Sequence, residues 1–139
     1  MKILIAVDGS DYTRRALAFL AAHDGLRVGH ELTVFTVALA LPHRAAAFVG
    51  SDLVQNYYWD DAEQVLGPIR EFLTQQGIVA SFEYEVGHPG RAIAARAHDG
   101  GYELVVMGSH GHGAVGALVL GSVATTVLAS CKVPVLLVR

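Results

Sequence analysis

Hydrophobic positions along the chain follow two periods that alternate from the first residues to the last. Short apolar or partly alternating runs, typical of β-strands, cover residues 2–7, 31–37, 79–86, 103–107 and 133–138. Between them, apolar residues recur at helical spacing over residues 11–23, 52–76, 90–98 and 122–130. Strands that alternate with helices predict an α/β domain with a parallel sheet and helices on both faces, and right-handed crossovers favour a doubly wound sheet.

Cap and turn residues separate these elements. Ser10 is a good N-cap for the first helix, Gly25 and Gly29 end that segment, and Gly77 is the expected stop of the second helix. Residues 38–51 are expected to form a long connection. The composition marks no linker, so residues 1–139 are expected to form a single domain.

Glycines crowd the segment between the fourth predicted strand and the last predicted helix. They lie at Gly108, Gly111, Gly113, Gly116 and Gly121, and Ser122 opens the helix. A strand, a glycine-rich loop and a hydroxyl-capped helix form an arrangement that binds phosphate. Glycines let the backbone approach a ligand with its N–H groups turned inward, and the helix N-terminus adds positive potential.

Two better-known phosphate-binding patterns fit this loop incompletely. The spacing Gly111-x-Gly113-x-x-Gly116 matches the dinucleotide fingerprint. That fingerprint belongs to the first strand and needs an acidic residue about 20 positions further on, where this chain has none. Gly116 and Gly121 have the spacing of a P-loop, but Ser122 stands where the lysine is required. Neither pattern is therefore assigned.

The spacing that fits best is Gly108-x2-Gly111-x9-Gly121-Ser122, which resembles the nucleotide-binding motif of the universal stress protein family. The resemblance covers the whole chain. Similar segments are Ile-Ala-Val-Asp8-Gly-Ser, Gly87-His-Pro-Gly-Arg-Ala-Ile93, Leu104-Val-Val-Met-Gly108-Ser-His-Gly111 and Val133-Pro-Val-Leu-Leu-Val138. It implies a Rossmann-like fold, related to the adenine nucleotide alpha hydrolases, with five parallel strands in the order 3-2-1-4-5. It also implies a cytoplasmic stress-response protein, usually a homodimer, that binds ATP.

The resemblance further implies a binding site where the winding of the sheet reverses, between the first and fourth strands. The phosphates are assigned to the glycine loop and Ser122, the adenosine to the neighbourhood of Asp8, and the adenine ring to three apolar strand residues. The implied nucleotide-binding residues are Val7, Asp8, Val37, Met107, Gly108, Ser109, His110, Gly111, Gly121, Ser122 and Val123.

Each of these assignments has a structural alternative that the sequence leaves open. The glycines can serve the turn alone, and Ser122 can be a plain N-cap. Asp8 can form a cap or an Asx turn before the first helix. Val7, Val37 and Met107 can be simple core residues.

The expected phosphate loop carries little positive charge. Residues 108–123 contain no Lys or Arg, and only His110 and His112 could carry charge there. Phosphate binding would therefore depend on neutral N–H groups, on Mg²⁺ and on the helix dipole, at about 0.3–1 kcal/mol per contribution. We expect micromolar or weaker affinity for ATP. The two histidines lack a nearby third ligand, so no protein metal site is assigned.

Composition narrows the classes of function. The net charge of −3 without a basic cluster argues against nucleic acid, and no apolar stretch reaches the ~18 residues of a membrane helix. Asp8 interrupts the first apolar run too soon for a signal peptide. The single Cys131 excludes an internal disulfide, so a cytoplasmic location is expected.

No residue is assigned a catalytic role. The chain has no Gly-x-Ser-x-Gly elbow to activate Ser109 or Ser122, Cys131 is expected to be packed, and no second carboxylate pairs visibly with Asp8. The favoured function is an ATP-binding regulatory module. The alternatives are an interaction protein whose loop is empty, and a slow ATPase whose phosphate release stops in Asp8→Ala.

Two features concern partners. The apolar strand from Val133 to Val138 lies at the end of the predicted sheet and is expected to form the edge of a homodimer, the alternative being an edge hidden by a loop. The cluster Tyr57-Tyr58-Trp59 either begins the core face of the second helix or forms an exposed patch that covers the nucleotide or meets a partner.

Overall fold

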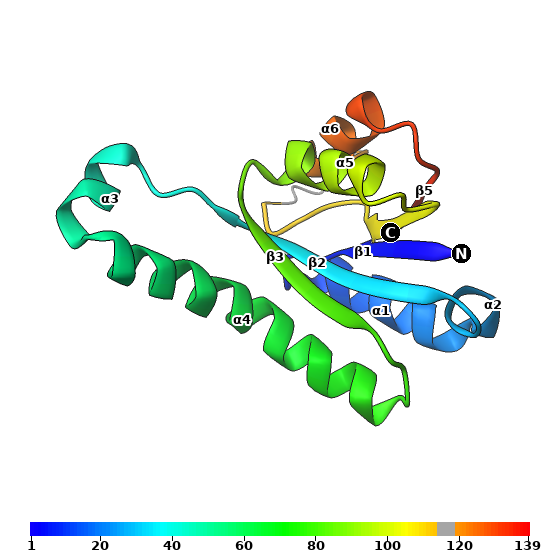
Figure 1. Ribbon diagram of the computed structural model, residues 1–139. Coiled ribbons are helices and arrows are strands. Elements are labelled where there is room, and N and C mark those ends of the chain that lie inside the picture. Colours follow the sequence, from blue (N-terminus) through cyan, green and yellow to red (C-terminus); the bar gives the residue numbers. More distant parts are fainter. Residues whose placement is uncertain (114–118) are drawn as a thin grey trace.

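Five parallel strands form one sheet, in the order β3-β2-β1-β4-β5, in the computed structural model of the chain (Figure 1). The structure describes residues 1–113 and 119–139. The elements are β1 (Lys2–Ala6), α1 (Asp11–Ala22), α2 (Asp24–Arg27), β2 (Glu31–Leu39), α3 (His43–Val49), α4 (Ser51–Gln75), β3 (Ser81–Gly87), α5 (Pro89–Asp99), β4 (Leu104–Gly108), α6 (Ser122–Ser130) and β5 (Val135–Val138). The predicted fold class and strand order are confirmed.

The central strand, β1, is buried on both faces. Ile5 is opposite Val34 of β2 on one side and Val106 of β4 on the other. Successive side chains of β1 enter two different core clusters, Ile5 one of them and Leu4 the other. A continuous apolar run is what such a strand requires, because helices cover both of its faces.

Helices lie on the two faces of the sheet in pairs. α1 and α4 cover one face, where Leu17 and Leu66 pack with Ile5, and α5 and α6 cover the other, where Ile93 and Val127 pack around Phe35 (Figure 1). The crossovers on the two sides of β1 therefore run over opposite faces. In such sheets the carboxyl ends of the strands at the reversal border a crevice.

Residues 38–51 differ from the connection expected from the sequence. β2 continues to Leu39, and the alanine-rich segment after it forms α3. Alanine favours the helix although the segment lacks a clear amphipathic period. Gly50, with a φ of 77°, then separates α3 from α4. An irregular loop was therefore the wrong expectation here.

The predicted helix ends are partly right. The Ser10 hydroxyl accepts a hydrogen bond from the Thr13 N–H at 3.4 Å, which confirms the cap of α1. Gly77, with a φ of 68°, follows the end of α4 as expected. Gly25 does not end a helix but lies inside the short α2, and the left-handed turn comes at Gly29, with a φ of 76°.

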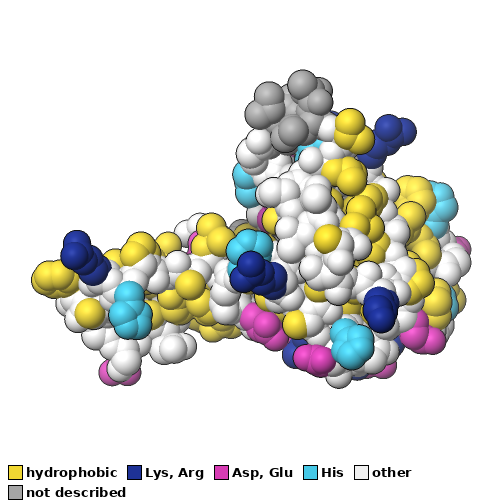
Figure 2. All heavy atoms as spheres, turned by 90° about the horizontal axis from the view of Figure 1, so that it is seen from above, with side chains coloured by type: hydrophobic (Ala, Val, Ile, Leu, Met, Phe, Trp, Pro, Cys, Tyr) yellow, Lys and Arg dark blue, Asp and Glu magenta, His cyan; other side chains and the backbone are white. Residues whose placement is uncertain are grey.

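An arm of residues 43–59, made of α3 and the start of α4, projects from the body of the molecule (Figures 1 and 2). It carries exposed apolar side chains, among them Phe48, Leu53 and Trp59. In the described part of the chain, no helix combines the length and the apolar character needed to cross a membrane.

Candidate functional site

A cavity of about 640 Å³ lies at the carboxyl ends of β1, β2 and β4, where the winding of the sheet reverses. Small-molecule sites in proteins typically measure about 300–1,000 Å³. The cavity is lined by Ala6, Val7, Asp8, Thr13, Thr36, Val37, Ala38, Leu39, Tyr57, Asp61, Ala62, Gln64, Val65, Pro89, Ile93, Met107, Gly108, His110, Gly111, His112, Gly113, Gly121, Ser122, Val123 and Ala124. The tertiary structure thus brings together every residue predicted for the site except Ser109.

Ser109 lies behind the cavity wall instead of in it. The residue is fully buried, its N–H donates to the Val138 carbonyl at 2.8 Å, and its hydroxyl contacts His110 Nδ1 at 2.8 Å. Its own carbonyl accepts the Gly121 N–H at 2.8 Å. Ser109 therefore ties the glycine loop to β5 and to the start of α6.

All three motif glycines lie where an added side chain would be crowded. A methyl group at Gly108 would lie 2.6 Å from Tyr12 Cβ. A methyl group at Gly111 would lie 2.7 Å from Asp8 Oδ2, and one at Gly121 would lie 3.0 Å from His110 Cα and 3.3 Å from the Ser109 carbonyl oxygen. A methyl group at Gly113 would meet no atom within 4 Å. Gly108 and Gly121 thus lie close to neighbouring backbone atoms, whereas Gly111 lies close to the Asp8 carboxylate. Gly116, which completed both discounted patterns, lies outside the described residues.

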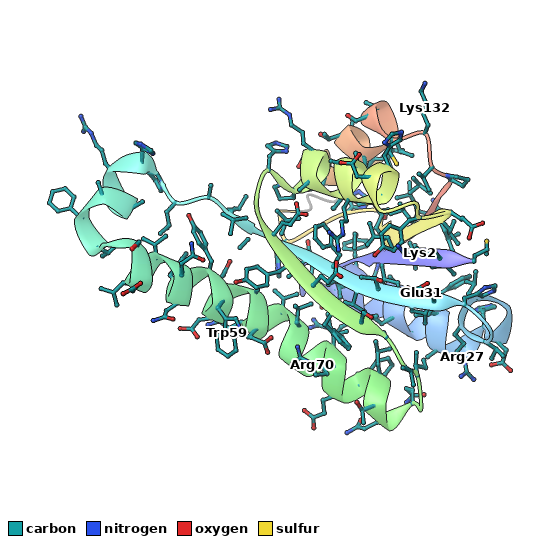
Figure 3. All side chains as sticks on the ribbon, in the orientation of Figure 1. Lys2, Arg27, Glu31, Trp59, Arg70 and Lys132 are labelled. Carbon is teal, nitrogen blue, oxygen red and sulfur yellow. The ribbon has the colours of Figure 1, made fainter. Side chains whose placement is uncertain are left out.

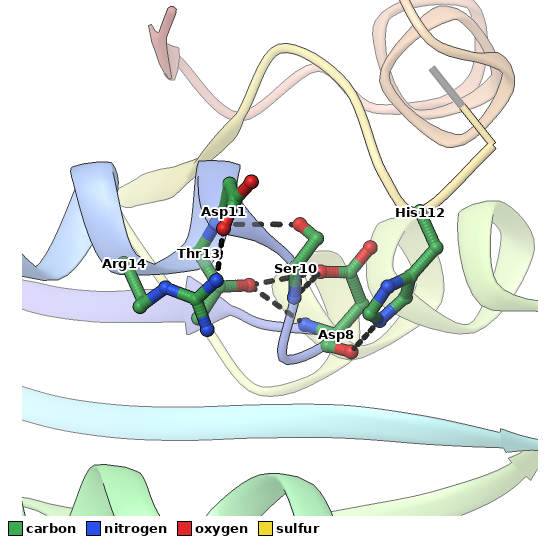
Figure 4. A network of polar contacts seen from close by, with 6 residues as sticks. All are labelled: Asp8, Ser10, Asp11, Thr13, Arg14 and His112. Carbon is green, nitrogen blue, oxygen red and sulfur yellow. Dashed lines mark hydrogen bonds and ion pairs between the residues drawn. The ribbon is translucent and has the colours of Figure 1, made fainter.

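The Asp8 carboxylate orders the turn between β1 and α1 (Figure 4). Its Oδ1 accepts hydrogen bonds from the Ser10 N–H and from the Thr13 hydroxyl, both at 2.9 Å. His112 Nε2 donates to the Asp8 backbone carbonyl at 2.7 Å and so connects the glycine loop to this turn. The structure therefore contains the Asx turn that the sequence left open, while Asp8 also lines the cavity.

An apolar surface forms at the strand ends. Val7 and Met107 are buried in opposite core clusters, and the half-buried Val37 packs against the second of them. All three also border the cavity. They serve as core residues and as cavity lining together, so the two interpretations left open by the sequence are not exclusive.

The start of α6 presents backbone donors to the cavity. Its cap residue is Gly121, whose carbonyl accepts the Thr125 N–H at 3.0 Å. Ser122 is the first helical residue, so the expectation that its hydroxyl caps α6 is wrong. The N–H groups of Ser122, Val123 and Ala124 have no intrahelical acceptor, and no other acceptor for them occurs in residues 1–113 and 119–139.

The charged side chains of the cavity lining are mainly carboxylates. Asp8 and Asp61 are its carboxylates, and the described lining contains no Lys or Arg. Besides His110 and His112, positive potential in the lining can come from the helix N-terminus or from a bound cation. Across the described ranges, three or more His, Cys, Asp or Glu side chains nowhere come close enough to hold a metal ion.

Two arginines line a neighbouring cavity. A second, open cavity of about 470 Å³ shares Gly111 and His112 with the first and is lined by Arg14 and Arg15 of α1. Arg14 forms an ion pair with Asp11, and the Arg15 guanidinium lies 4.8 Å from the centre of the Tyr12 ring. These cations thus border the second cavity and not the larger one.

α4 contributes a wall of the cavity, of which the sequence suggested only the aromatic cluster that contains Tyr57. Tyr57, Asp61 and Val65 line the cavity from this helix. Tyr58, in contrast, is buried, and its hydroxyl accepts the Leu41 N–H at 2.8 Å, whereas Trp59 is 54% exposed on the side of α4 away from the sheet (Figure 3). The three neighbouring aromatic residues therefore have three different environments. The spacing of four residues from 57 to 61 to 65 was the signal available in the sequence.

Comparison with known proteins agrees with this architecture. The model of the universal stress protein family matches residues 1–139. The chain is 31% identical to "Universal stress protein YxiE" of Bacillus subtilis, over 99% of this chain and 98% of that protein. It is 33% identical to "Universal stress protein in QAH/OAS sulfhydrylase 3'region" of Thermus aquaticus, over 99% and 97% of the two chains.

Solved structures are similar over nearly the whole length. The structure of the protein MJ0577 of Methanocaldococcus jannaschii has a TM-score of 0.81 and 27% identity, and the alignment covers 99% of this chain and 94% of that one. The Arabidopsis thaliana protein At3g01520, solved with AMP bound, has a TM-score of 0.69 and 12% identity over 99% and 90%. A universal stress protein in complex with cAMP has a TM-score of 0.62 and 21% identity over 100% and 96%.

Proposed function

Because the chain belongs to the universal stress protein family, we propose that it is an adenine-nucleotide-binding regulatory protein whose cavity holds ATP. One observation carries the proposal: three N–H groups of α6 that have no acceptor among the described residues, together with the motif glycines, border a cavity of nucleotide size at the reversal of the sheet. Structures of two relatives in fold, solved with AMP and with cAMP, support the class of ligand.

Different walls of the cavity are proposed to bind different parts of the nucleotide. The phosphates lie at the start of α6, where Ser122 and Val123 offer N–H groups and Ser122 adds a hydroxyl. The adenine ring lies on the apolar surface of Val7, Val37 and Met107. The N–H of Gly121 already donates to the Ser109 carbonyl and does not bind phosphate. The role of this glycine is to let the loop pack closely against the start of α6.

A magnesium ion would accompany the phosphates. Mg²⁺ in nucleotide sites is commonly held by one or two carboxylates together with phosphate oxygens and water. Asp8 fits the role of a Mg²⁺ ligand, because its Oδ2 accepts no hydrogen bond within the described residues and points toward Gly111. The ion would supply the positive charge that the lining lacks.

Titration with ATP in the presence of Mg²⁺ is expected to give micromolar or weaker affinity, and removal of the ion with EDTA is expected to weaken it further. The reason is that helix-dipole and N–H contributions of about 0.3–2 kcal/mol replace the missing cationic side chains. Isothermal titration calorimetry measures both values. Nanomolar affinity, or affinity that is indifferent to Mg²⁺, contradicts this account of the charge.

The nucleotide content of the purified protein tests the function itself. The protein is denatured, and the released small molecules are separated by ion-exchange chromatography and identified by mass spectrometry. We expect an adenine nucleotide in the released fraction or, after its removal, saturable binding of ATP. If millimolar ATP with Mg²⁺ does not bind, the proposal fails in favour of an interaction protein with an empty loop.

A homodimer through β5 is the proposed assembly. This strand is the last of the sheet, pairs with β4 on one side only and is half-buried along its length. An exposed apolar edge strand needs a cover, and the same strand of a second copy can provide it. Sedimentation equilibrium is expected to give the mass of two 14.7 kDa chains. The mass of one chain would contradict the dimer without bearing on nucleotide binding.

A further inference from the structure

Three of the five α4 residues that line the cavity form one stripe, the other two being Ala62 and Gln64. Tyr57, Asp61 and Val65 are spaced by four residues and therefore lie on the same face of the helix. Val65 approaches the turn after β1, where its Cγ2 would lie 3.5 Å from a methyl group at Gly9. The stripe thus extends along the cavity from this turn toward the arm, with Asp61 in its middle.

Asp61 differs from the other carboxylates of α4 because it both lines the cavity and lacks a partner in the described part of the chain. It is half-buried, and within residues 1–113 and 119–139 it takes part in no hydrogen bond and no ion pair. Glu63, on the same helix, pairs with Arg70 through two contacts of 3.0 and 3.1 Å. Asp8, the other carboxylate of the lining, already accepts hydrogen bonds from its own turn.

The position of α4 decides which part of a nucleotide Asp61 can meet. α4 covers one face of the sheet and α6 the other, so the two helices border the cavity from opposite faces (Figure 1). Phosphates at the start of α6 are then kept away from Asp61, which would repel them. The portion of the ligand on the α4 side is the nucleoside.

A carboxylate is purely an acceptor and therefore selects donors. Adenosine offers donors of two kinds, the ribose hydroxyls and the 6-amino group. In other nucleotide-binding sheets an acidic residue binds ribose hydroxyls. A carboxylate without a partner, next to an apolar surface for the ring, is thus complementary to a nucleoside. The same carboxylate would repel the phosphate end of the ligand.

We propose that Asp61 is the specificity-determining residue of the site and accepts a hydrogen bond from a donor group of the nucleoside. The inference rests on the proposed nucleotide binding and goes beyond it. It extends the proposed orientation by giving the nucleoside a polar contact on the α4 side, opposite the phosphates at α6. It also predicts that the protein binds adenosine without any phosphate.

Adenosine in EDTA is the cleanest probe, because it excludes both phosphate repulsion and a metal ion. Asp61→Ala is expected to weaken adenosine binding about tenfold or more, since a hydrogen bond to a charged group contributes about 1.5–3 kcal/mol. The matched control is Asp60→Ala, which removes the same charge from the neighbouring, exposed position that does not line the cavity. Thermal unfolding by circular dichroism establishes that both variants fold.

Two analogues distinguish the donors. If the ribose is recognised, the wild-type protein discriminates against 2′-deoxyadenosine and Asp61→Ala does not. If the amino group is recognised, the same holds for inosine. Either result supports the proposal.

Three outcomes overturn it. Wild-type-like adenosine affinity in folded Asp61→Ala does so, as does tighter ATP binding in that variant without a loss for adenosine, because Asp61 then only repels phosphate. A wild-type protein that binds neither adenosine nor ATP refutes the proposed function and this inference together. Normal wild-type binding with an indifferent Asp61→Ala refutes this inference alone.

Discussion

Gly121→Val is expected to lower the affinity for ATP about 100-fold or more in a chain that still folds. The first carbon of the new side chain would lie 3.0 Å from His110 Cα and 3.3 Å from the Ser109 carbonyl oxygen, and backbone atoms cannot rotate away. The start of α6 must then shift, so that its N–H groups no longer point toward the phosphates. Two lost hydrogen bonds to phosphate, at about 1.5–3 kcal/mol each, amount to about 100-fold or more in affinity.

The matched control for this variant is Gly113→Ala in the same loop. Its added methyl group would meet no atom within 4 Å, so we expect a loss at least about ten times smaller. Calorimetric titration with Mg²⁺-ATP measures both affinities, and circular dichroism confirms folding. If folded Gly121→Val binds ATP as the wild type does, the glycine loop is a structural connection and not a phosphate site.

Phe35→Ala is expected to have the largest effect on stability. Phe35 is fully buried in the middle of β2, between Ala6 of β1 and Glu83 of β3. Truncation of a buried phenylalanine typically costs about 3–5 kcal/mol, from lost transfer free energy and the cavity left behind. Because the free energy of unfolding of a domain is about 5–15 kcal/mol, this variant is expected to lose a large part of it.

Phe48→Ala makes the same chemical change at an exposed place. Phe48 is 91% exposed on α3, so the expected change is within about 0.5 kcal/mol. Urea unfolding followed by fluorescence and circular dichroism gives both free energies. Equal losses of unfolding free energy in the two variants would mean that Phe48 is buried in solution against a partner or a second copy. The arm would then be a contact surface.

The order of the elements could be predicted from the sequence because hydrophobic periodicity is a local property. The continuous apolar runs of β1 and β4 are typical of strands covered on both faces, which favours a parallel sheet flanked by helices. The spacing of Gly108, Gly111 and Gly121 likewise lies within one stretch of chain. The exception was α3, whose alanines favour a helix without marking a buried face.

The roles of individual site residues depended on contacts between distant segments. Asp8 forms a turn with Ser10 and Thr13, while His112 reaches its carbonyl from more than 100 residues away. Ser109 is predicted from its place in the motif to meet the nucleotide, yet it lies behind the cavity wall. No pattern in the sequence shows which of two adjacent loop residues faces a cavity, because this depends on where β5 and α6 pack.

The sequence by itself thus determined the fold class, and it predicted a single domain and a phosphate-type loop, because each follows from periodicity or spacing within a short segment. Only the tertiary structure decided which wall faces that loop. α4 precedes the loop by more than 30 residues, and its stripe of Tyr57, Asp61 and Val65 became part of the site only when α4 packed beside α1 on the sheet. When the apolar face of α4 packs against the core, the side chains next to that face are placed beside the cavity. Helical periodicity alone does not reveal this placement.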